Sequence, residues 1–212
     1  MTNQLYLIIA LIFVIAVAVI LLPRLKRSRQ TIFTEDIYSI DLHKIDITDI
    51  DKMSDGHDFE IYLFRLFQAL RYKAYKTVGS RDFGADLVFH DSDGDRTVVQ
   101  AKRYSLDNPV GLGGVQEVFS SMRYYKAKKS VLITSSSFTE ACETLAGINH
   151  VKLIDRKDLI AIINDFKQGK IDQAKAFIES EPHMILTPWT ELLETAQDIK
   201  RDYKVEKRIK QS

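Results

Sequence analysis

Residues 86–102 have the sequence DLVFHDSDGDRTVVQAK, in which two apolar stretches flank a turn rich in aspartate and glycine. This pattern predicts two antiparallel strands joined by a tight turn. If the hairpin pivots at Asp93, Asp86 lies directly opposite Gln100. The two-residue period of a strand then places Gln100 and Lys102 on one face. The hairpin therefore predicts a carboxylate, an amide and an ammonium on a common surface.

Such a set of groups suits phosphodiester hydrolysis. Oxygens of Asp86 and Gln100 can bind a hard cation such as Mg²⁺, and the Lys102 ammonium can stabilise charge that develops on the phosphate. A neutral amide binds a hard cation more weakly than a carboxylate does, so a second carboxylate would help. Glu60 is the candidate, because it lies on the helix face that carries Phe64 and Phe67 and points toward the sheet.

Several segments around the hairpin resemble, in order, the PD-(D/E)xK nuclease superfamily and, within it, the Mrr-like restriction endonucleases. They are GHDFE at residues 56–60, SRDFGADL at 80–87, VQAKRY at 99–104, and NPV at 108–110 followed by a helix with Gln116 and Glu117. The resemblance covers roughly residues 54–165, about half of the chain. It implies a sandwich of helices around a mixed sheet and Mg²⁺-dependent cleavage of DNA, with Mn²⁺ as a substitute. Gln100 replaces the carboxylate common in the superfamily but fits the Mrr-like pattern.

Each candidate also has a structural interpretation. Asp86 could be a strand-end carboxylate bonded to amides, although its place before Leu87-Val88-Phe89 favours a metal ligand, since an ionised group there needs compensation. Lys102 could form a purely structural ion pair with Asp86. Glu60 could be a first-turn glutamate favoured by the helix dipole. We predict Asp86, Gln100, Lys102 and Glu60 as catalytic residues, with Asp86, Gln100 and Glu60 as metal ligands.

The remaining elements follow from apolar periodicity and turn residues. Ser54 or Asp55 is expected to cap a helix with apolar residues from Phe59 to Leu70, and residues 31–53 to form a linker or a short covering strand. Strands are expected at 75–78, 85–90, 97–103, 130–134 and 151–154, and helices at 115–125, 139–147, 157–166, 171–179 and 191–210. The predicted fold is α/β, a restriction-endonuclease-like mixed sheet flanked by helices, with one preceding transmembrane helix and a helical C-terminal extension.

Residues 5–22 form an unbroken apolar or aromatic run, which is long enough to cross a bilayer as a helix. A cleaved signal peptide is the alternative, but no basic residue precedes the run and no small-residue cleavage site follows it. Four cations lie within residues 24–29, and basic flanks stay on the cytoplasmic side. The single Cys142 agrees with a reducing compartment. We therefore expect a single-pass protein of the inner or plasma membrane with a cytoplasmic catalytic domain.

The sequence thus predicts an anchor and basic flank at 1–29, a juxtamembrane linker at 30–53, an endonuclease domain at 54–166 and a helical extension at 167–212. The expected activity is that of a membrane-anchored Mg²⁺-dependent endonuclease acting on DNA in restriction or defence. A non-catalytic DNA-binding or membrane scaffold and a nuclease for RNA or DNA repair remain alternatives. Double-strand cutting needs two active sites, which favours a homodimer. The net charge of +1 gives no global attraction to DNA, so local cationic clusters would have to supply it.

Overall fold

The computed structural model describes residues 40–53, 55–79, 83–184 and 207. Within these residues the helices are α2 (Ile47–Lys52), α3 (Gly56–Ala69), α4 (Gly113–Tyr125), α5 (Glu140–Asn149), α6 (Arg156–Lys167) and α7 (Ile171–Glu179). The strands are β1 (Lys73–Lys76), β2 (Leu87–His90), β3 (Arg96–Lys102), β4 (Lys129–Thr134) and β5 (Val151–Ile154).

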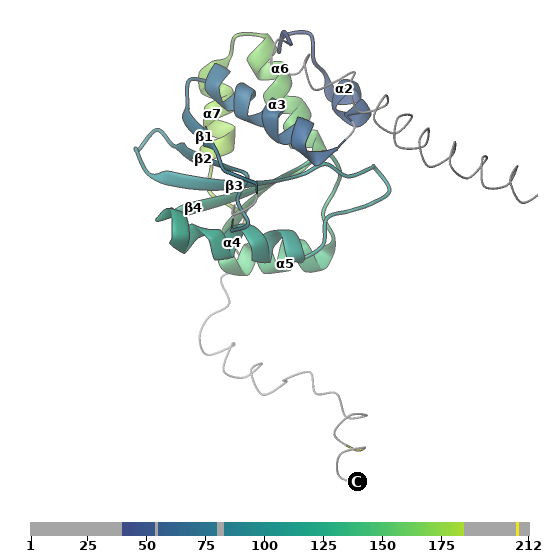
Figure 1. The fold of residues 1–212 in the computed structure, drawn as a ribbon, viewed down its shortest axis with the longest axis vertical. Helices are drawn as coiled ribbons and strands as arrows, with labels where there is room; N and C mark the ends of the chain where they lie inside the picture. Colours follow the sequence, from purple (N-terminus) through teal and green to yellow (C-terminus); the bar gives the residue numbers. More distant parts are fainter. Residues whose placement is uncertain (1–39, 54, 80–82, 185–206, 208–212) are drawn as a thin grey trace, which may run out of the picture.

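The described strands form one mixed sheet in the order β1-β2-β3-β4-β5. Strands β1, β2 and β3 are antiparallel neighbours, whereas β3, β4 and β5 are parallel. Parallel neighbours need a crossover connection, and α4 and α5 supply the two that this sheet requires. Figure 1 shows α4 and α5 on one face of the sheet and α3, α6 and α7 on the other. The predicted α/β class with a mixed sheet flanked by helices is confirmed.

The β2–β3 hairpin has the register that its sequence predicts. Leu87 pairs with Val99 and His90 pairs with Arg96, which places the pivot at Asp93 and Asp86 opposite Gln100. The turn is held by the Asp91 carboxylate, which accepts hydrogen bonds from the backbone N–H groups of Asp93 and Asp95 at 3.1 and 2.8 Å. A short aspartate side chain that bonds its own backbone is a common way to fix a turn. The local chemistry of the turn therefore fixes which residues face each other.

Each face of the sheet has its own apolar core. The first core contains alternate strand residues and the inward faces of α3 and α6, including Leu87, Phe89, Val99, Phe59, Leu63, Phe67, Leu159 and Ile162. The second core contains the intervening strand residues and residues of α4 and α5, including Val88, Val98, Leu132, Val115, Val118 and Cys142. Full burial of one such side chain contributes about 1.5–3 kcal/mol. Because side chains alternate along β3, Gln100 and Lys102 share the α4 face with Val98.

Helix α2 lies where the sequence led us to expect a linker or a short strand. Its N-cap Asp46 accepts hydrogen bonds from the backbone of Thr48 and Asp49, and the Asp49 carboxylate accepts one from Asp46 in return. This reciprocal capping stabilises a short helix that has little apolar periodicity of its own. Ile50 is fully buried and Ile47 is partly buried against the same core, so α2 packs on the core through these two side chains.

Two other elements begin two residues earlier than expected. Strand β1 begins at Lys73, because Arg71 adopts a φ of 66° and reverses the chain directly after α3. Helix α4 begins at Gly113. A Cβ at the next residue, Gly114, would lie 3.0 Å from Val110 and 3.1 Å from Leu132, so the absence of a side chain lets the first turn of the helix pack closely on the sheet. The other strands and helices between β2 and α7 agree with the predicted ranges to within about two residues.

Some predictions concern residues outside the described part of the chain. They are the apolar run at 5–22 with its basic flank, Asp82 of the resembling SRDFGADL segment, and nearly all of the helix expected at 191–210. Among the described residues, no helix has the length and apolar character that crossing a bilayer requires.

Candidate active site

Asp86 directly precedes β2 and is only 5% exposed. Its Oδ2 accepts hydrogen bonds from the Gln100 side-chain amide at 2.5 Å and from the Ala101 backbone N–H at 2.7 Å. Its own backbone N–H donates to the Val99 carbonyl at 2.8 Å, which continues the hairpin ladder. A buried carboxylate is tolerated only when such partners compensate for lost water. The hairpin register therefore positions the Asp86 carboxylate.

Gln100 is buried beside Asp86, on the α4 face of β3. Its amide nitrogen donates to Asp86, so its amide oxygen is the group that can accept from water or bind a cation. The predicted pairing of Asp86 with Gln100 is thus present as a direct side-chain contact.

Lys102 lies at the end of β3, two residues beyond Gln100 on the same face. Its Nζ pairs with the Glu117 carboxylate of α4 at 2.5 Å, and its side chain is 22% exposed. The Lys102 carbonyl accepts a hydrogen bond from the Thr134 hydroxyl of β4 at 2.8 Å, which fixes the end of the strand. The ammonium is therefore paired with Glu117 of α4, a partner that differs from the Asp86 partner that we weighed from the sequence.

Glu117 comes close to the site because α4 packs against the loop before β2. Gly84 has a φ of +91°, and a Cβ at this position would lie 2.4 Å from the Glu117 carbonyl oxygen. Beside it, Phe83 stacks on Tyr124 of α4 with ring centroids 4.1 Å apart. Glycine is thus required twice, for backbone conformation and for close approach of the helix. The Gln116–Glu117 pair was part of the family resemblance, but no periodicity could indicate that Glu117 bonds Lys102.

Glu60 has a different set of neighbours. Its Oε2 lies 2.6 Å from Nζ of Lys76 and 3.7 Å from Nδ1 of His57. Lys76 lies opposite Leu87, whose side chain belongs to the core beneath α3, whereas Gln100 and Lys102 face α4. In the described contacts Glu60 does not meet Asp86, Gln100 or Lys102. The structure thus brings three of the four predicted residues together on the hairpin and adds Lys76 as a partner of Glu60.

The donor set suits a weakly held hard cation. No group of three or more His, Cys, Asp and Glu side chains able to hold a metal occurs among the described residues. A site built from Asp86 and the Gln100 amide oxygen therefore depends on water and substrate phosphate for its other ligands. Mg²⁺ commonly binds in this way, through one or two carboxylates together with water and phosphate oxygens. The residues fit that ion better than Zn²⁺, which favours nitrogen and sulfur ligands.

Comparison with solved structures finds resemblances of low sequence identity. The MspJI restriction endonuclease in complex with a 27-mer oligonucleotide is 20% identical with a TM-score of 0.43, over 70% of this chain and 38% of that chain. The DNA modification-dependent restriction endonuclease AspBHI is 20% identical with a TM-score of 0.46, over 70% and 42%. A protein of unknown function, AF1548, is 15% identical with a TM-score of 0.38, over 70% and 73%. This chain spans about two fifths of the first two proteins.

No curated protein matches the sequence significantly. A family profile described as restriction endonuclease, Mrr_cat, matches residues 50–163. This range contains the hairpin, α3 and α4, and therefore every residue of the site described above. Because the match spans more than half of the 212 residues, the chain belongs to the Mrr_cat family of restriction endonucleases.

Proposed function

We propose that this chain is a Mg²⁺-dependent endonuclease that hydrolyses DNA phosphodiester bonds at Asp86, Gln100 and Lys102. The chain carries a restriction endonuclease catalytic domain, and members of that family are typically dependent on a divalent metal. The observation that carries the residue assignment is the 2.5 Å bond between Asp86 and Gln100, with Lys102 on the same strand face. Retention of both Asp86 and Lys102 argues against a scaffold that has lost catalysis.

Each side chain has a distinct role in this proposal. Asp86 and the Gln100 amide oxygen hold the cation, and Lys102 orients the attacking water and stabilises the charge of the phosphorane. A bound Mg²⁺ would act as a Lewis acid on the phosphate and would help to activate water. Glu117 restrains the Lys102 ammonium through the ion pair between them. Glu60 remains our proposed additional ligand, direct or through water, and would have to exchange its bond with Lys76 for that task.

We extend the proposal to the biological setting. Family membership supports restriction of foreign or modified DNA, and cutting of both strands would bring two copies together as a homodimer. Residues 1–29 would anchor the chain, residues 30–53 would link it to the nuclease domain at 54–166, and residues 167–212 would follow as an extension. The cytoplasmic domain would then meet incoming DNA at the inner or plasma membrane.

Plasmid cleavage by the full-length protein in detergent tests the activity. We expect cleavage with Mg²⁺ or Mn²⁺, little turnover with Ca²⁺, and none in excess chelator. Lys102→Ala should lower the rate by at least about a hundredfold, because one charge-stabilising group at the transition state has that effect. Lys157→Ala is the matched control, since Lys157 is exposed on α6. Undiminished cleavage by Lys102→Ala, or in chelator, would refute the assignment.

Protease accessibility tests the proposed orientation. Protease added outside intact spheroplasts should leave the domain that contains Lys102 uncut, because transfer of the four cations at residues 24–29 across the bilayer is disfavoured. Digestion of that domain without lysis would contradict a cytoplasmic location.

A further inference from the structure

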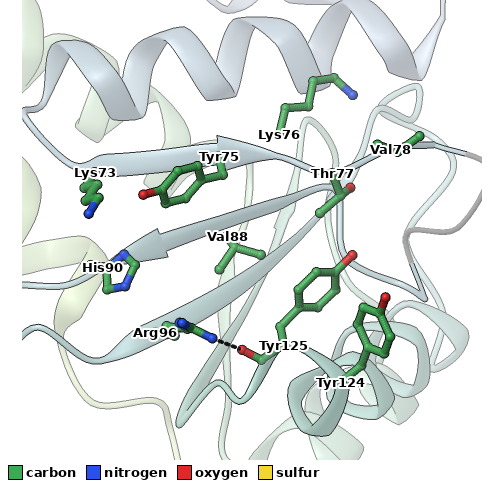
Figure 2. Close-up of a pocket in the computed structure, with 10 residues that line it drawn as sticks. All are labelled: Lys73, Tyr75, Lys76, Thr77, Val78, Val88, His90, Arg96, Tyr124 and Tyr125. Carbon is green, nitrogen blue, oxygen red and sulfur yellow. Dashed lines mark hydrogen bonds between the residues drawn. The ribbon is translucent and has the colours of Figure 1, made fainter.

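The α4 face of the sheet has a second feature beside the candidate active site. A pocket of about 850 Å³ lies over β1, β2 and the start of β3, where Tyr124 and Tyr125 at the end of α4 form one wall. Figure 2 shows the side chains of Tyr75, Val88 and Arg96 along the strands, to the left of these two tyrosines. Helix α4 packs on β3 and β4, which leaves this part of the face open.

The pairing of the strands arranges the pocket as parallel rows. Lys73, His90 and Arg96 are direct neighbours across β1, β2 and β3. The next row on the same face is Tyr75, Val88 and Val98. The third row contains Thr77, Asp86 and Gln100. Thr77 donates its backbone N–H to the Asp86 carbonyl at 2.9 Å, and the Gln100 side chain donates to the Asp86 carboxylate.

The rows place the pocket in direct continuity with the site. Two residues along an antiparallel strand span about 6.8 Å, so the row that contains Lys73 and Arg96 lies about 14 Å along the strands from the row of Asp86. The row that contains Tyr75 lies between them. A chain of phosphates that passes Asp86 and runs along the hairpin would therefore reach Lys73 and Arg96 while its bases cross Tyr75.

The aromatic rings in and beside the pocket are exposed to solvent. Tyr75 is 47% exposed and Tyr124 is 60% exposed. Phe83, which stacks on Tyr124, is 51% exposed and extends the same apolar surface toward the start of β2. Exposed rings that border a groove are characteristic of proteins on which nucleic acid bases stack.

The charge of the pocket is complementary to phosphate. None of the described residues that line it is acidic, and Lys73 and Arg96 are both exposed at its far end. The Arg96 guanidinium is oriented by a hydrogen bond to the Tyr125 carbonyl at 3.1 Å. His90 contributes a buried Nδ1 with no hydrogen-bond partner among the described residues, and its ring lies edge-on to Tyr75. The pocket therefore offers cationic and polar groups at one end and aromatic surface along its length.

We propose that this pocket binds an unpaired segment of the DNA strand whose scissile phosphate lies at Asp86 and Lys102. Bases of that segment stack on Tyr75 and Tyr124, and its phosphates contact Lys73 and Arg96. A paired duplex presents its backbone and groove edges, so its bases could not cover these rings, whereas every unpaired base has a free face. The proposal rests on the proposed nuclease function and adds a preference for DNA with an unpaired region beside the cut.

The test measures binding without turnover. Full-length protein in Ca²⁺ is titrated with a labelled duplex and with the same duplex that carries a short unpaired segment. The double variant Tyr75→Leu with Tyr124→Leu should weaken binding of the partly unpaired probe by at least about tenfold, because each lost stacking contact typically has such an effect. Its affinity for the full duplex should not change. Tyr75→Phe with Tyr124→Phe keeps both rings and should bind as the wild type does.

Two controls make the result specific. Phe119→Leu removes an exposed aromatic ring from α4 outside the pocket and should leave both affinities unchanged. Lys73→Gln should reduce the slope of log affinity against log salt by about one for the partly unpaired probe.

The outcomes separate this proposal from the nuclease proposal. Equal affinity of wild type and the leucine variant for the partly unpaired probe would overturn the proposed role of the pocket. An equal loss of affinity for both probes would overturn it as well. A wild type that binds the unpaired probe through the tyrosines but never cleaves DNA would refute the nuclease function alone. Normal cleavage without any tyrosine-dependent binding would refute the pocket alone.

Discussion

At the scale of residues, the site depends on two side-chain contacts that cross different elements. Asp86 and Gln100 meet across the hairpin, and Lys102 meets Glu117 between the sheet and α4. In the proposed mechanism the first contact fixes the oxygens that would bind a cation, and the second restrains the Lys102 ammonium. A lysine side chain has considerable rotamer freedom, so a carboxylate that restrains it reduces the entropy that must be lost at the transition state.

Glu117→Gln should therefore slow cleavage by about ten- to hundredfold, because small misplacement of a catalytic group has effects of that size. DNA affinity in Ca²⁺ should stay the same or increase, since a negative charge near the phosphate is removed. Single-turnover rates and binding titrations distinguish the two effects. Glu117→Asp should restore part of the rate if the carboxylate acts by holding Lys102, and a wild-type rate in Glu117→Gln would show that Lys102 needs no such restraint.

The predictability of the site can be judged from these same residues. Asp86 and Gln100 could be paired from the sequence because the Asp-Gly turn and the two-residue strand period determine register. The partners of Glu60 and Lys102 could not be predicted from the sequence. These partners, Lys76 and Glu117, lie on separate elements whose packing no local pattern encodes. For the same reason, periodicity missed α2, which depends on the cap formed by Asp46 and Asp49.

At the scale of elements, α4 is positioned by the loop that precedes β2. Gly84 lets the backbone of that loop lie against the backbone of α4 at Glu117, and the stack of Phe83 on Tyr124 extends the contact. This one packing contact places Glu117 near Lys102 and the tyrosines beside the pocket. The glycine two residues before Asp86 is therefore needed for the close packing of α4 against this loop.

Gly84→Ala should lower the free energy of unfolding by about 2–4 kcal/mol, since a left-handed backbone and an overpacked contact each contribute. Gly94→Ala in the hairpin turn is the matched control: its φ is +83°, but a Cβ there would meet nothing within 4 Å. It should cost about 1–2 kcal/mol from backbone strain alone. Urea unfolding of both variants measures the difference, and equal destabilisation would mean that the approach of α4 to Gly84 is not tight.

At the scale of the whole molecule, Asp91 connects the hairpin turn to the rest of the sheet. Its carboxylate is 1% exposed and lies 2.8 Å from Nζ of Lys129 on β4, in addition to accepting the two turn amides. The adjacent Ser92 donates its backbone N–H and its hydroxyl to Glu179 of α7 at 3.2 and 3.0 Å. The turn thus joins residues that are far apart in sequence. Burial alone would raise the pKa of Asp91, but the Lys129 ammonium and the turn amides outweigh burial and hold it below its usual range.

A lowered pKa in the folded state means that this carboxylate stabilises the fold above its unfolded value, near 3.9, and loses that contribution as pH falls through the folded value. Asp91→Asn should therefore lower stability at pH 7 by about 1–3 kcal/mol, the usual range for loss of a charged hydrogen-bond partner. The difference between wild type and variant should shrink below about pH 4. Urea unfolding between pH 7 and pH 3 checks this, and a difference independent of pH would contradict the proposed role of the charge.

The central claim is that the Asp86 carboxylate supports metal-dependent hydrolysis, and single-turnover cleavage by Asp86→Asn at saturating Mg²⁺ tests it most directly. Asparagine keeps the shape of the side chain, so it can still accept the Ala101 N–H while the charge is lost. Asp93→Asn, in the exposed turn of the same hairpin, is the control. We predict that Asp86→Asn folds and binds DNA but cleaves at least about a hundredfold more slowly, whereas Asp93→Asn cleaves normally. Cleavage by Asp86→Asn at the wild-type rate would contradict the account.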